Sequence, residues 1–452
     1  MRLRKTITTI VATAILLAGW QLFAVIANQP ELIPSLPRLV RTLCEWLVSG
    51  SFYQSVGATI LRGILGMSIS FVCAIGMAGL FARFEWVYEL FRPLLAIMRS
   101  IPVISFILLA LIFLNPESIP LMIAFLTMFP LLTENLTRGI LDLRPGLSIM
   151  ARQFHIKRSN VLFQIIYPQL KPFLYSGLAS AAGFGWRAII MGEVLSQCAF
   201  GIGSEMKRAQ NFIAVPELLA WTIVAVFISF FFDKGISKVA DITPKISFAN
   251  EDQTIPTPTL SVLDTKDISY QYGIQHFSHS FQKGIIYGIS APSGKGKTTL
   301  LNLIGGILLP TEGEIHPTRH FGIATIFQQP QLLPHLTAEE NIILPLSSFL
   351  TEEKARRIAQ KHLQEMEMEP FGNRYPKELS YGQQQRIAIA RALASPSPLL
   401  LMDEPFKGLD EALSHRIIER IREMQMKEER IILFTSHNPD EIRLLADEVI
   451  YL

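Results

Sequence analysis

The sequence is poor in cysteine and in charged residues. Its three cysteines, Cys44, Cys73 and Cys198, lie far apart, and none belongs to a Cys-x-x-Cys pair. This spacing indicates neither a disulfide framework nor a cysteine-based metal site. Only 17% of the 452 residues are charged, whereas 50% are hydrophobic, a balance that is unusual for a soluble protein. The second half of the chain has no basic stripe, which argues against a nucleic-acid partner.

Charge and hydrophobicity divide the chain into two halves. Residues 1–250 contain 21 Lys and Arg against 12 Asp and Glu, whereas residues 251–452 contain 20 against 26. A basic, apolar first half followed by a mildly acidic second half predicts a membrane domain joined to a globular one. We expect a transmembrane domain over 1–240, a linker over 241–259, where prolines stand among Thr, Ser and Asn, and a globular domain over 260–452.

The first half contains apolar stretches long enough to cross a bilayer, and these must be helical because lipid cannot satisfy free backbone groups. The first stretch follows the basic start Met1–Lys5 and exceeds the usual length of a signal-peptide core, so we interpret it as an uncleaved span. The predicted spans are residues 7–27, 58–81, 94–114, 118–141, 173–195 and 217–232.

Basic residues gather before the first span, between the second and third, between the fourth and fifth, and after the sixth. By the positive-inside rule these segments lie in the cytoplasm, together with the N-terminus and the second half. The sequence therefore predicts a multi-pass protein of the cytoplasmic (inner) membrane, in contact with lipid.

A glycine-rich segment, Ala291-Pro-Ser-Gly-Lys-Gly-Lys-Thr-Thr299, follows an apolar strand-like run and precedes a helix-like run. This is the context of a phosphate loop. Its backbone N–H groups surround the phosphates of ATP, Lys297 reaches the β- and γ-phosphates, and the Thr298 hydroxyl ligates Mg²⁺. Ala291 departs from the usual pattern, which begins with glycine. The predicted ATP contacts are Ser293, Gly294, Lys295, Gly296, Lys297, Thr298 and Thr299.

A second acidic site follows the apolar run Leu399–Met402, which we expect to be a buried strand. It ends in Asp403 and Glu404, at the strand edge where ligands bind in open α/β sheets. Asp403 is suited to hold Mg²⁺, and Glu404 is suited to polarise the attacking water as a general base.

The segment Leu379-Ser-Tyr-Gly-Gln-Gln-Gln-Arg386 resembles the signature sequence of ATP-binding-cassette ATPases, which usually reads Leu-Ser-Gly-Gly-Gln. Other motifs of that family occur in the expected order along the chain. Gln328, before the signature, matches the Q-loop, and after it Gly408-Leu-Asp410 matches the D-loop and His437 the switch histidine. Tyr381 replaces the first signature glycine. The resemblance implies that Gln328 contacts Mg²⁺ and serves catalysis with Glu404 and His437. It also implies further ATP contacts by Tyr272, which stacks on adenine, and by Ser380, Gly382, Gln383 and Asp410.

In this ATPase family the signature of one subunit completes the phosphate loop of the other, so the resemblance implies a homodimer. The membrane half resembles permeases that import alkanesulfonates, taurine, nitrate and thiamine-pyrimidine precursors. Residues 149–168 resemble the cytoplasmic loop by which such permeases grip their ATPase, with His155 in place of a glycine and Pro168 at its end. The resemblance further implies a periplasmic or lipid-anchored solute-binding protein as a partner.

Charged residues also lie within or beside the predicted spans. Arg187 and Glu193 are candidates for a solute path, because intramembrane charges usually face protein or water. They are six residues apart, so a mutual pair on one helix is less natural. Glu134 and Arg138 are four apart and can pair on one helix face. Together with Arg99, Arg187 favours an anionic solute.

The sequence therefore predicts an all-α membrane domain, resembling a type I importer permease, followed by an α/β P-loop ATPase domain. The predicted function is ATP-driven import of a small polar, anionic solute. Two alternatives stay open: a half-transporter exporter, which has the same domain order, and a membrane ATPase that moves no solute. Short loops and the importer-like cytoplasmic segment favour import over export.

Overall fold

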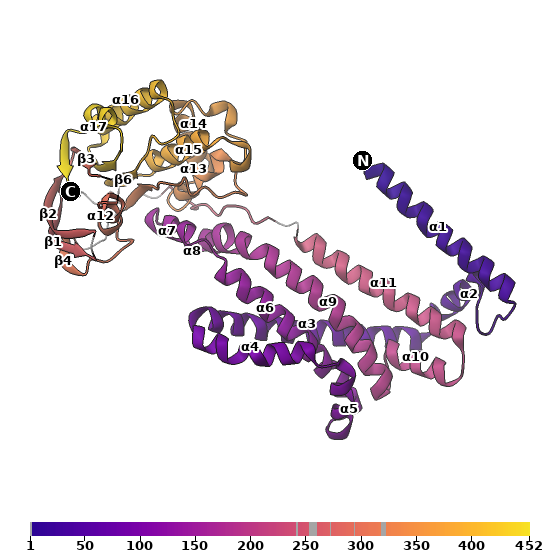
Figure 1. Cartoon of the computed structure of the whole chain (residues 1–452). Coiled ribbons are helices and arrows are strands. Elements are labelled where there is room, and N and C mark those ends of the chain that lie inside the picture. Colours follow the sequence, from indigo (N-terminus) through magenta and orange to yellow (C-terminus); the bar gives the residue numbers. More distant parts are fainter. Residues whose placement is uncertain (1, 241–242, 253–259, 272, 293, 318–321) are drawn as a thin grey trace. The chain divides into compact units, whose positions relative to one another are not determined.

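The computed structural model describes residues 2–240, 243–252, 260–271, 273–292, 294–317 and 322–452. These residues form two compact units (Figure 1). The first unit contains Met1–Leu143 and Gln169–Thr243, and the second contains Arg144–Pro168 and Pro244–Leu452. The segment expected to grip the ATPase therefore groups with the second half of the chain, although it lies between helices of the first.

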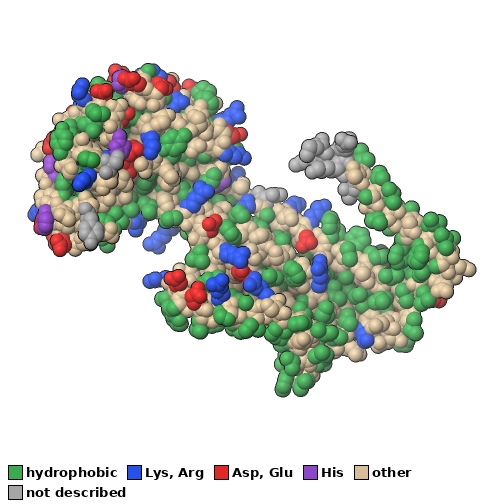
Figure 2. Space-filling model, in the orientation of Figure 1, with side chains coloured by type: hydrophobic (Ala, Val, Ile, Leu, Met, Phe, Trp, Pro, Cys, Tyr) green, Lys and Arg blue, Asp and Glu red, His purple; other side chains and the backbone are tan. Residues whose placement is uncertain are grey.

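The first unit is helical. Among its described residues it contains α1 (Arg2–Ala27), α2 (Leu36–Trp46), α3 (Gly50–Arg83), α4 (Glu85–Ser100), α5 (Val103–Phe113), the short η1 (Pro116–Ser118), α6 (Ile119–Leu141), α9 (Tyr167–Ser196), α10 (Ile202–Asn211) and α11 (Val215–Ala240). Large apolar side chains stay exposed along these helices, as in Ile112, which is 72% exposed. Figure 2 shows such side chains over much of the visible face of the helical unit. This surface suits a lipid environment.

Small residues line the buried face of α3. The buried positions of α3 are Ser55, Thr59, Gly63, Gly66, Ser70, Ala74, Ala78 and Phe81, so all but the last are small. A Cβ added to Gly66 would lie 2.6 Å from the Cβ of Ala124 on α6. Small residues at such spacing let two helix backbones approach closely, which is how helices pack inside membranes.

Four of the predicted spans correspond to long apolar helices, in the segments Gly50–Arg83, Pro116–Leu141, Arg158–Ser196 and Val215–Ala240. The first predicted span lies in α1. The span expected over 94–114 is not one straight helix, because α4 and α5 meet at a bend of 94°. Ile101, which precedes Pro102, has an extended backbone with ψ 129°. Proline disfavours the helical conformation in the preceding residue, which explains the break.

The second unit is an α/β domain with two sheets. Strands β3 (Ile286–Ser290), β5 (Ile323–Ile326), β6 (Leu399–Asp403), β7 (Ile431–Thr435) and β8 (Glu448–Tyr451) form a parallel sheet in the order β5-β6-β7-β3-β8. Strands β1 (Val262–Tyr270), β2 (Ile274–Gln282) and β4 (Glu312–His316) form an antiparallel sheet in the order β2-β1-β4. The predicted buried strand before Glu404 is β6, and all of its residues are buried.

Helices surround the parallel sheet. They are α12 (Lys297–Ile304), α13 (Ala338–Leu346), α14 (Glu352–Glu365), α15 (Tyr381–Ala394), α16 (Glu411–Glu428) and α17 (Pro439–Leu445). Local sequence starts several of them: Thr337 and Glu340 form a capping box on α13, and Ser380 and Gln383 form one on α15. The same unit includes α7 (Pro145–Gln153), the single turn α8 (Arg158–Asn160) and a π-helical stretch, η2 (Val161–Ile166).

Candidate nucleotide site and coupling segment

The predicted phosphate loop connects β3 to α12, which begins at Lys297. Gly294 and Gly296 have positive φ angles of 80° and 90°, the left-handed conformation that favours glycine. A Cβ added to Gly296 would lie 2.5 Å from the carbonyl oxygen of Gly273. Ala291 is not among the residues with positive φ, so its methyl group fits where the family pattern has glycine. The predicted ATP contacts Ser293 and Tyr272 lie outside the described residues.

The two predicted Mg²⁺ ligands of the loop and the sheet meet directly. The Thr298 hydroxyl donates a hydrogen bond of 2.9 Å to Oδ2 of Asp403, and the Thr435 hydroxyl donates one of 2.7 Å to Oδ1. Asp403 and Thr435 are register partners at the ends of β6 and β7, so the parallel sheet itself holds this arrangement. A hydroxyl and a carboxylate beside a phosphate loop fit Mg²⁺, which takes few protein oxygens and completes its shell with phosphates and water.

Glu404 lies at the centre of a polar cluster. Its Oε1 is 2.8 Å from Nε2 of His437, and its Oε2 is 3.3 Å from Nζ of Lys407. Gln328 also hydrogen-bonds the Glu404 side chain, so the structure brings the three predicted catalytic residues together. In this arrangement Gln328 contacts the carboxylate of Glu404 rather than the pair formed by Thr298 and Asp403. Glu404 has a φ of 47°, and its N–H donates to both the carbonyl and the hydroxyl of Thr435.

Opposing influences set the acidity of Glu404. Burial would raise the pKa of this carboxyl, but the hydrogen bond and charge of Lys407, the charge of His437 and the Gln328 hydrogen bond outweigh it and lower the pKa. The carboxylate is therefore ionised, as a general base must be. The sequence analysis missed Lys407; its spacing of three residues from Glu404 was the available signal.

The signature segment contacts the Q-loop and the D-loop of its own chain. The Tyr381 hydroxyl donates a hydrogen bond of 2.8 Å to the carbonyl oxygen of Gln328. A Cβ added to Gly382 would lie 2.6 Å from the carbonyl oxygen of Gly408, so only glycine allows this approach. Asp410 accepts a bond of 2.9 Å from the N–H of Leu413 and caps α16.

The two halves of the predicted nucleotide site are not joined within one chain. Among the described residues, no hydrogen bond or ion pair links the signature (380–383) to the phosphate loop (294–299). Ser380 and Gln383 bond each other in the capping box, and Lys297 donates a bond of 2.6 Å to the carbonyl of Ala291. The exposed Lys295 and the half-buried Thr299 flank that lysine in the loop and helix start.

The coupling segment (residues 144–168) packs into the core of the second unit. Leu147, Met150, Phe154 and other residues of the segment are buried in one cluster with residues of α13, α15 and β5. The side-chain amide of Gln153 donates a bond of 2.7 Å to the carbonyl of Gly305, directly after α12. A Cβ added to Gly146 would lie 2.7 Å from the side chain of Gln331, three residues beyond Gln328. The segment thus reaches both the phosphate-loop helix and the Q-loop region.

His155 shows why this position suits glycine. Its φ is 52°, in the left-handed region, and its ring Nδ1 lies 3.1 Å from the carbonyl oxygen of Gln153. The side chain is otherwise exposed. Histidine is among the non-glycine residues that adopt this conformation most often. Pro168 lies just after the π-helical stretch η2, at the start of α9, within the continuous helical segment Arg158–Ser196.

Glu193 serves as a structural charge in this arrangement rather than lining an open path. Its side chain is 0% exposed, and it accepts bonds from Thr59, from Arg62 at 2.7 Å and from the N–H of Gly203 at 2.9 Å. Arg62 also bonds Glu117 at 2.7 Å. A fully buried carboxylate with these partners holds α3, α9 and the start of α10 together.

Of the other intramembrane charges, Glu134 pairs with both Arg138 and Arg99. The predicted pairing of Glu134 with Arg138 on one helix face is therefore present. Arg187 differs, because its side chain is exposed and has no hydrogen bond or ion pair among the described residues. It is the candidate path residue that the fold leaves available.

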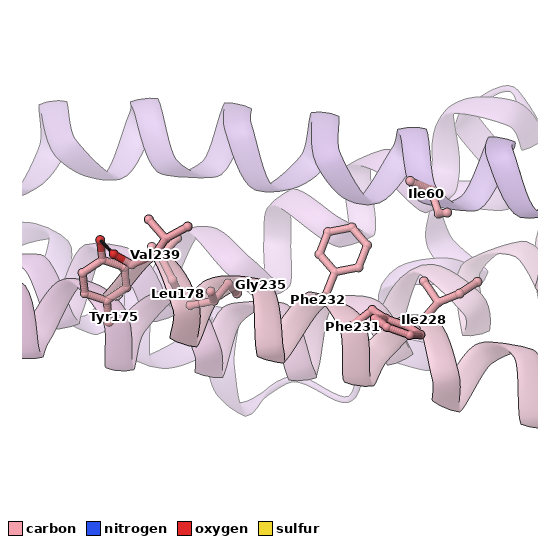
Figure 3. Close-up of a pocket in the computed structure, with 9 residues that line it drawn as sticks. Ile60, Tyr175, Leu178, Ile228, Phe231, Phe232, Gly235 and Val239 are labelled. Atoms are coloured by element: carbon pink, nitrogen blue, oxygen red, sulfur yellow. Dashed lines mark hydrogen bonds between the residues drawn. The ribbon is translucent and has the colours of Figure 1, made fainter. Parts of the chain in front are cut away.

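An apolar hollow of about 640 Å³ opens between α3, α9 and α11 (Figure 3). In the figure Phe231, Phe232 and Ile228 come from α11 and Ile60 from α3, and the dashed line marks the bond of 3.2 Å from the Tyr175 hydroxyl to the carbonyl of Val239. The residues that line this hollow are apolar apart from the Tyr175 hydroxyl and the backbone. The hollow is therefore not suited to a polar solute.

Comparison with known proteins matches both halves. The model of the family described as "ABC transporter" matches residues 274–407, and the model described as "Binding-protein-dependent transport system inner membrane component" matches residues 56–233. An uncharacterized ABC transporter ATP-binding protein of Methanocaldococcus jannaschii is 34% identical over 40% of this chain and 85% of its own length. The thiamine import ATP-binding protein of Yersinia pseudotuberculosis is 34% identical over 42% of this chain and 86% of its own length.

Other relatives match over a smaller share of their length. The Fe(3+) ions import ATP-binding protein of Rhizobium etli is 35% identical over 40% of this chain and 54% of its own length, so the chain spans about half of that relative. A solved structure of an ATP-binding cassette, described as a dimer bound to ADP and Pi, matches 42% of this chain and 94% of that chain, with 32% identity and a TM-score of 0.40.

The family-model matches and the two relatives covered over most of their length, together with the phosphate loop and the cluster around Glu404, define an ATP-binding-cassette protein. The chain belongs to the ABC transporter family. It joins a permease domain of the binding-protein-dependent type to an ABC ATPase domain in one polypeptide.

Proposed function

We propose that this chain hydrolyses ATP to drive the import of a small polar, anionic solute, and that it works as a homodimer with an external solute-binding protein. The observation that carries the proposal is the packing of the coupling segment against the ATPase residues that follow Gln328. Such packing gives the permease a physical contact through which the state of the nucleotide site can change its conformation. The relatives named as import proteins support the direction of transport.

The geometry around Glu404 supports ATP hydrolysis. Glu404 is ionised and is held by His437 at 2.8 Å, so it can accept the proton of an attacking water. Lys297 and the loop amides bind the phosphates, and Thr298 and Asp403 hold Mg²⁺, which neutralises charge on the phosphates. His437 holds the carboxylate of Glu404 in place through Oε1.

The homodimer rests on the separation of the signature from the phosphate loop within one chain. We expect Lys297 and Thr298 of one protomer to share an ATP with Ser380 and Gly382 of its partner. Mixing Lys297→Ala chains with Ser380→Ala chains gives dimers that have one intact composite site and one doubly altered site. Proven heterodimers with no ATPase activity beyond that of either variant alone would contradict the composite site.

The solute proposal rests on Arg187. A charge within a bilayer costs roughly 2.5–3.5 kcal/mol on insertion scales, so an exposed, unpaired arginine should face water or another protein surface. There it lowers the barrier for a passing anion such as a sulfonate or nitrate. We expect Arg187→Gln to reduce uptake of an anionic solute in liposomes with the cognate binding protein, and Arg187→Lys to retain most of it.

Arg99→Gln is the matched control for Arg187, because Arg99 is paired with Glu134. Equal loss in both variants would indicate a general structural effect. Unchanged uptake in Arg187→Gln, or a cationic imported solute, would refute the anion assignment. The basic loops support a topology with the N-terminus and the ATPase domain in the cytoplasm, which cysteine labelling from each side of the membrane tests.

A further inference from the structure

The segment that follows α11 is held by specific hydrogen bonds. Residues 243–252 have no helix or strand, as expected of a linker. Yet the side chain of Asn160, which is 1% exposed, forms hydrogen bonds with both the carbonyl and the N–H of Ser247. Its Nδ2 donates a bond of 2.8 Å to the carbonyl of Ser247, and its Oδ1 accepts one of 2.8 Å from the N–H of Ser247. The same Nδ2 donates a bond of 2.8 Å to the hydroxyl of Ser347, after α13.

Contacts continue along the whole segment. The Gln164 amide donates a bond of 3.0 Å to the carbonyl of Pro244, and the N–H of Ala249 donates one of 3.0 Å to the carbonyl of Ser347. The carboxylate of Asp252 accepts bonds of 2.9 and 3.0 Å from the N–H and hydroxyl of Thr351, at the start of α14. Ile246 and Phe248 pack against the same apolar core that holds the coupling segment.

We propose that residues 244–252 form a clasp, which closes over the coupling segment and commits it to the ATPase domain of its own chain. The clasp binds two surfaces at once: Asn160 and Gln164 of the coupling segment, and Ser347 and Thr351 of the ATPase domain. This inference rests on the proposed function only in that the coupling segment is taken to transmit motion.

Chain continuity gives the clasp its selectivity. Residues 253–259, which join it to the ATPase domain, span at most about 25 Å when fully extended. Residues 241–243 join it to α11 on the other side, over an even shorter reach. In a homodimer two identical ATPase domains are present, but the clasp raises the local concentration of only one of them around each coupling segment.

Asn160 makes this closure costly to undo. Its amide uses its donors and its acceptor on two different segments, so opening the clasp or undocking the coupling segment leaves buried polar groups unpaired. Loss of the Asn160 hydrogen bonds should change the equilibrium constant between the closed and the open clasp by roughly 5- to 150-fold.

Cross-linking tests whether docking occurs within one chain. The N–H of Lys157 lies 2.9 Å from the hydroxyl of Ser348, so the two positions suit Lys157→Cys and Ser348→Cys with a short bismaleimide. The native cysteines are first replaced by serine. A chain with both new cysteines should cross-link internally, whereas co-expressed chains with one each should give no cross-linked dimer. Cross-linked dimers from the single-cysteine chains would overturn the proposal.

Hydrogen exchange in the full chain tests the clasp itself. We expect Asn160→Ala, and separately a Gly/Ser replacement of residues 244–252, to raise exchange across 145–166 by about 5- to 150-fold. The combined variant should show less than the sum of the two increases, because both changes weaken the closure of the clasp on Asn160.

Gln153→Ala is the matched control, because Gln153 bonds Gly305 and not the clasp. Its effect should add to that of the clasp replacement. A clasp replacement that leaves exchange across 145–166 unchanged, or full additivity with Asn160→Ala, would refute the clasp. Neither readout uses a solute or measures transport, so these results are separate from any failure of the import proposal.

Discussion

Arg391, on the helix that follows the signature, links that helix to the Q-loop region and to the coupling segment. Its side chain is 1% exposed. Its guanidinium donates bonds of 2.9 and 2.8 Å to the carbonyls of Pro330 and Gln331, and it lies 5.3 Å from the ring centre of Phe154. We predict that Arg391→Met destabilises the ATPase domain, because methionine fills the space but leaves both carbonyls without a donor.

The size of the effect follows from these contacts. Each buried carbonyl left unpaired costs about 1–3 kcal/mol, and a desolvated cation–π contact contributes about 2 kcal/mol. Burial acts in the opposite direction: it lowers the pKa of Arg391 to about 10. At about 1.4 kcal/mol per pKa unit, relief of that burial returns about 3 kcal/mol when the charge is removed. We therefore expect a net loss of roughly 1–5 kcal/mol in the free energy of unfolding.

Thermal unfolding of the full chain in detergent measures this loss. For a domain of this size, about 1 kcal/mol lowers the midpoint by roughly 2–4 °C, so the midpoint of Arg391→Met should fall by roughly 2–20 °C. Arg420→Met is the matched control, because Arg420 forms an exposed pair with Glu423 and should shift the midpoint by no more than a few degrees. Equal shifts in the two variants would refute the reasoning.

Further predictions concern the nucleotide site and the coupling segment. Glu404→Gln should lower ATP hydrolysis on the order of 10²–10⁴-fold while bound ATP is retained in a filter assay; a normal rate would exclude Glu404 as the base. Lys407→Ala removes a bond and a charge that lower the pKa of Glu404, so the acid limb of the ATPase pH profile should move to higher pH. Lys407→Arg should leave that limb in place, and an unshifted limb in Lys407→Ala would contradict the pairing. His155→Gly relieves a left-handed backbone and should change stability by roughly 0–1 kcal/mol in the favourable direction, whereas His155→Val should destabilise. Tyr381→Phe should raise hydrogen exchange around Gln328, because it removes one bond of about 0.5–1.5 kcal/mol; unchanged exchange would show that this bond is not formed in solution.

The strand and the helix that carry the nucleotide motifs are predictable from the sequence, because the patterns that define them are local. The apolar run before Asp403 is β6, and α12 begins at Lys297 within the predicted loop. The side chains of Gln328, Glu404 and His437 meet because parallel strands end at one edge of the sheet. The resemblance of the signature supplied Ser380 and Gly382, but the close approach of Gly382 to the carbonyl of Gly408 required the structure.

Two kinds of feature were not predicted: a bend within an apolar run, and contacts between residues far apart in the sequence. The apolar run over 94–114 contains Ile101-Pro102, and the run's hydrophobicity concealed the bend that this pair introduces. Residues 241–259 were interpreted as a linker from their composition, since no periodicity reports a side-chain bond such as that from Asn160 to Ser247, 87 residues away. Glu193 was considered with Arg187, its nearest charge in the predicted span, whereas its partner is Arg62, 131 residues away.

The ion-pair network of Arg62 imposes an order on the synthesis of the membrane domain. Arg62 emerges from the ribosome before Glu117, and its second partner, Glu193, follows 131 residues later. At about 5–20 residues per second, the arginine waits roughly 7–26 s for that carboxylate. During this interval α3 carries a charge that the membrane interior disfavours, and it stays dependent on water, lipid headgroups or Glu117. A chain that ends before residue 193 therefore lacks the buried carboxylate that pairs with Arg62 in the complete protein.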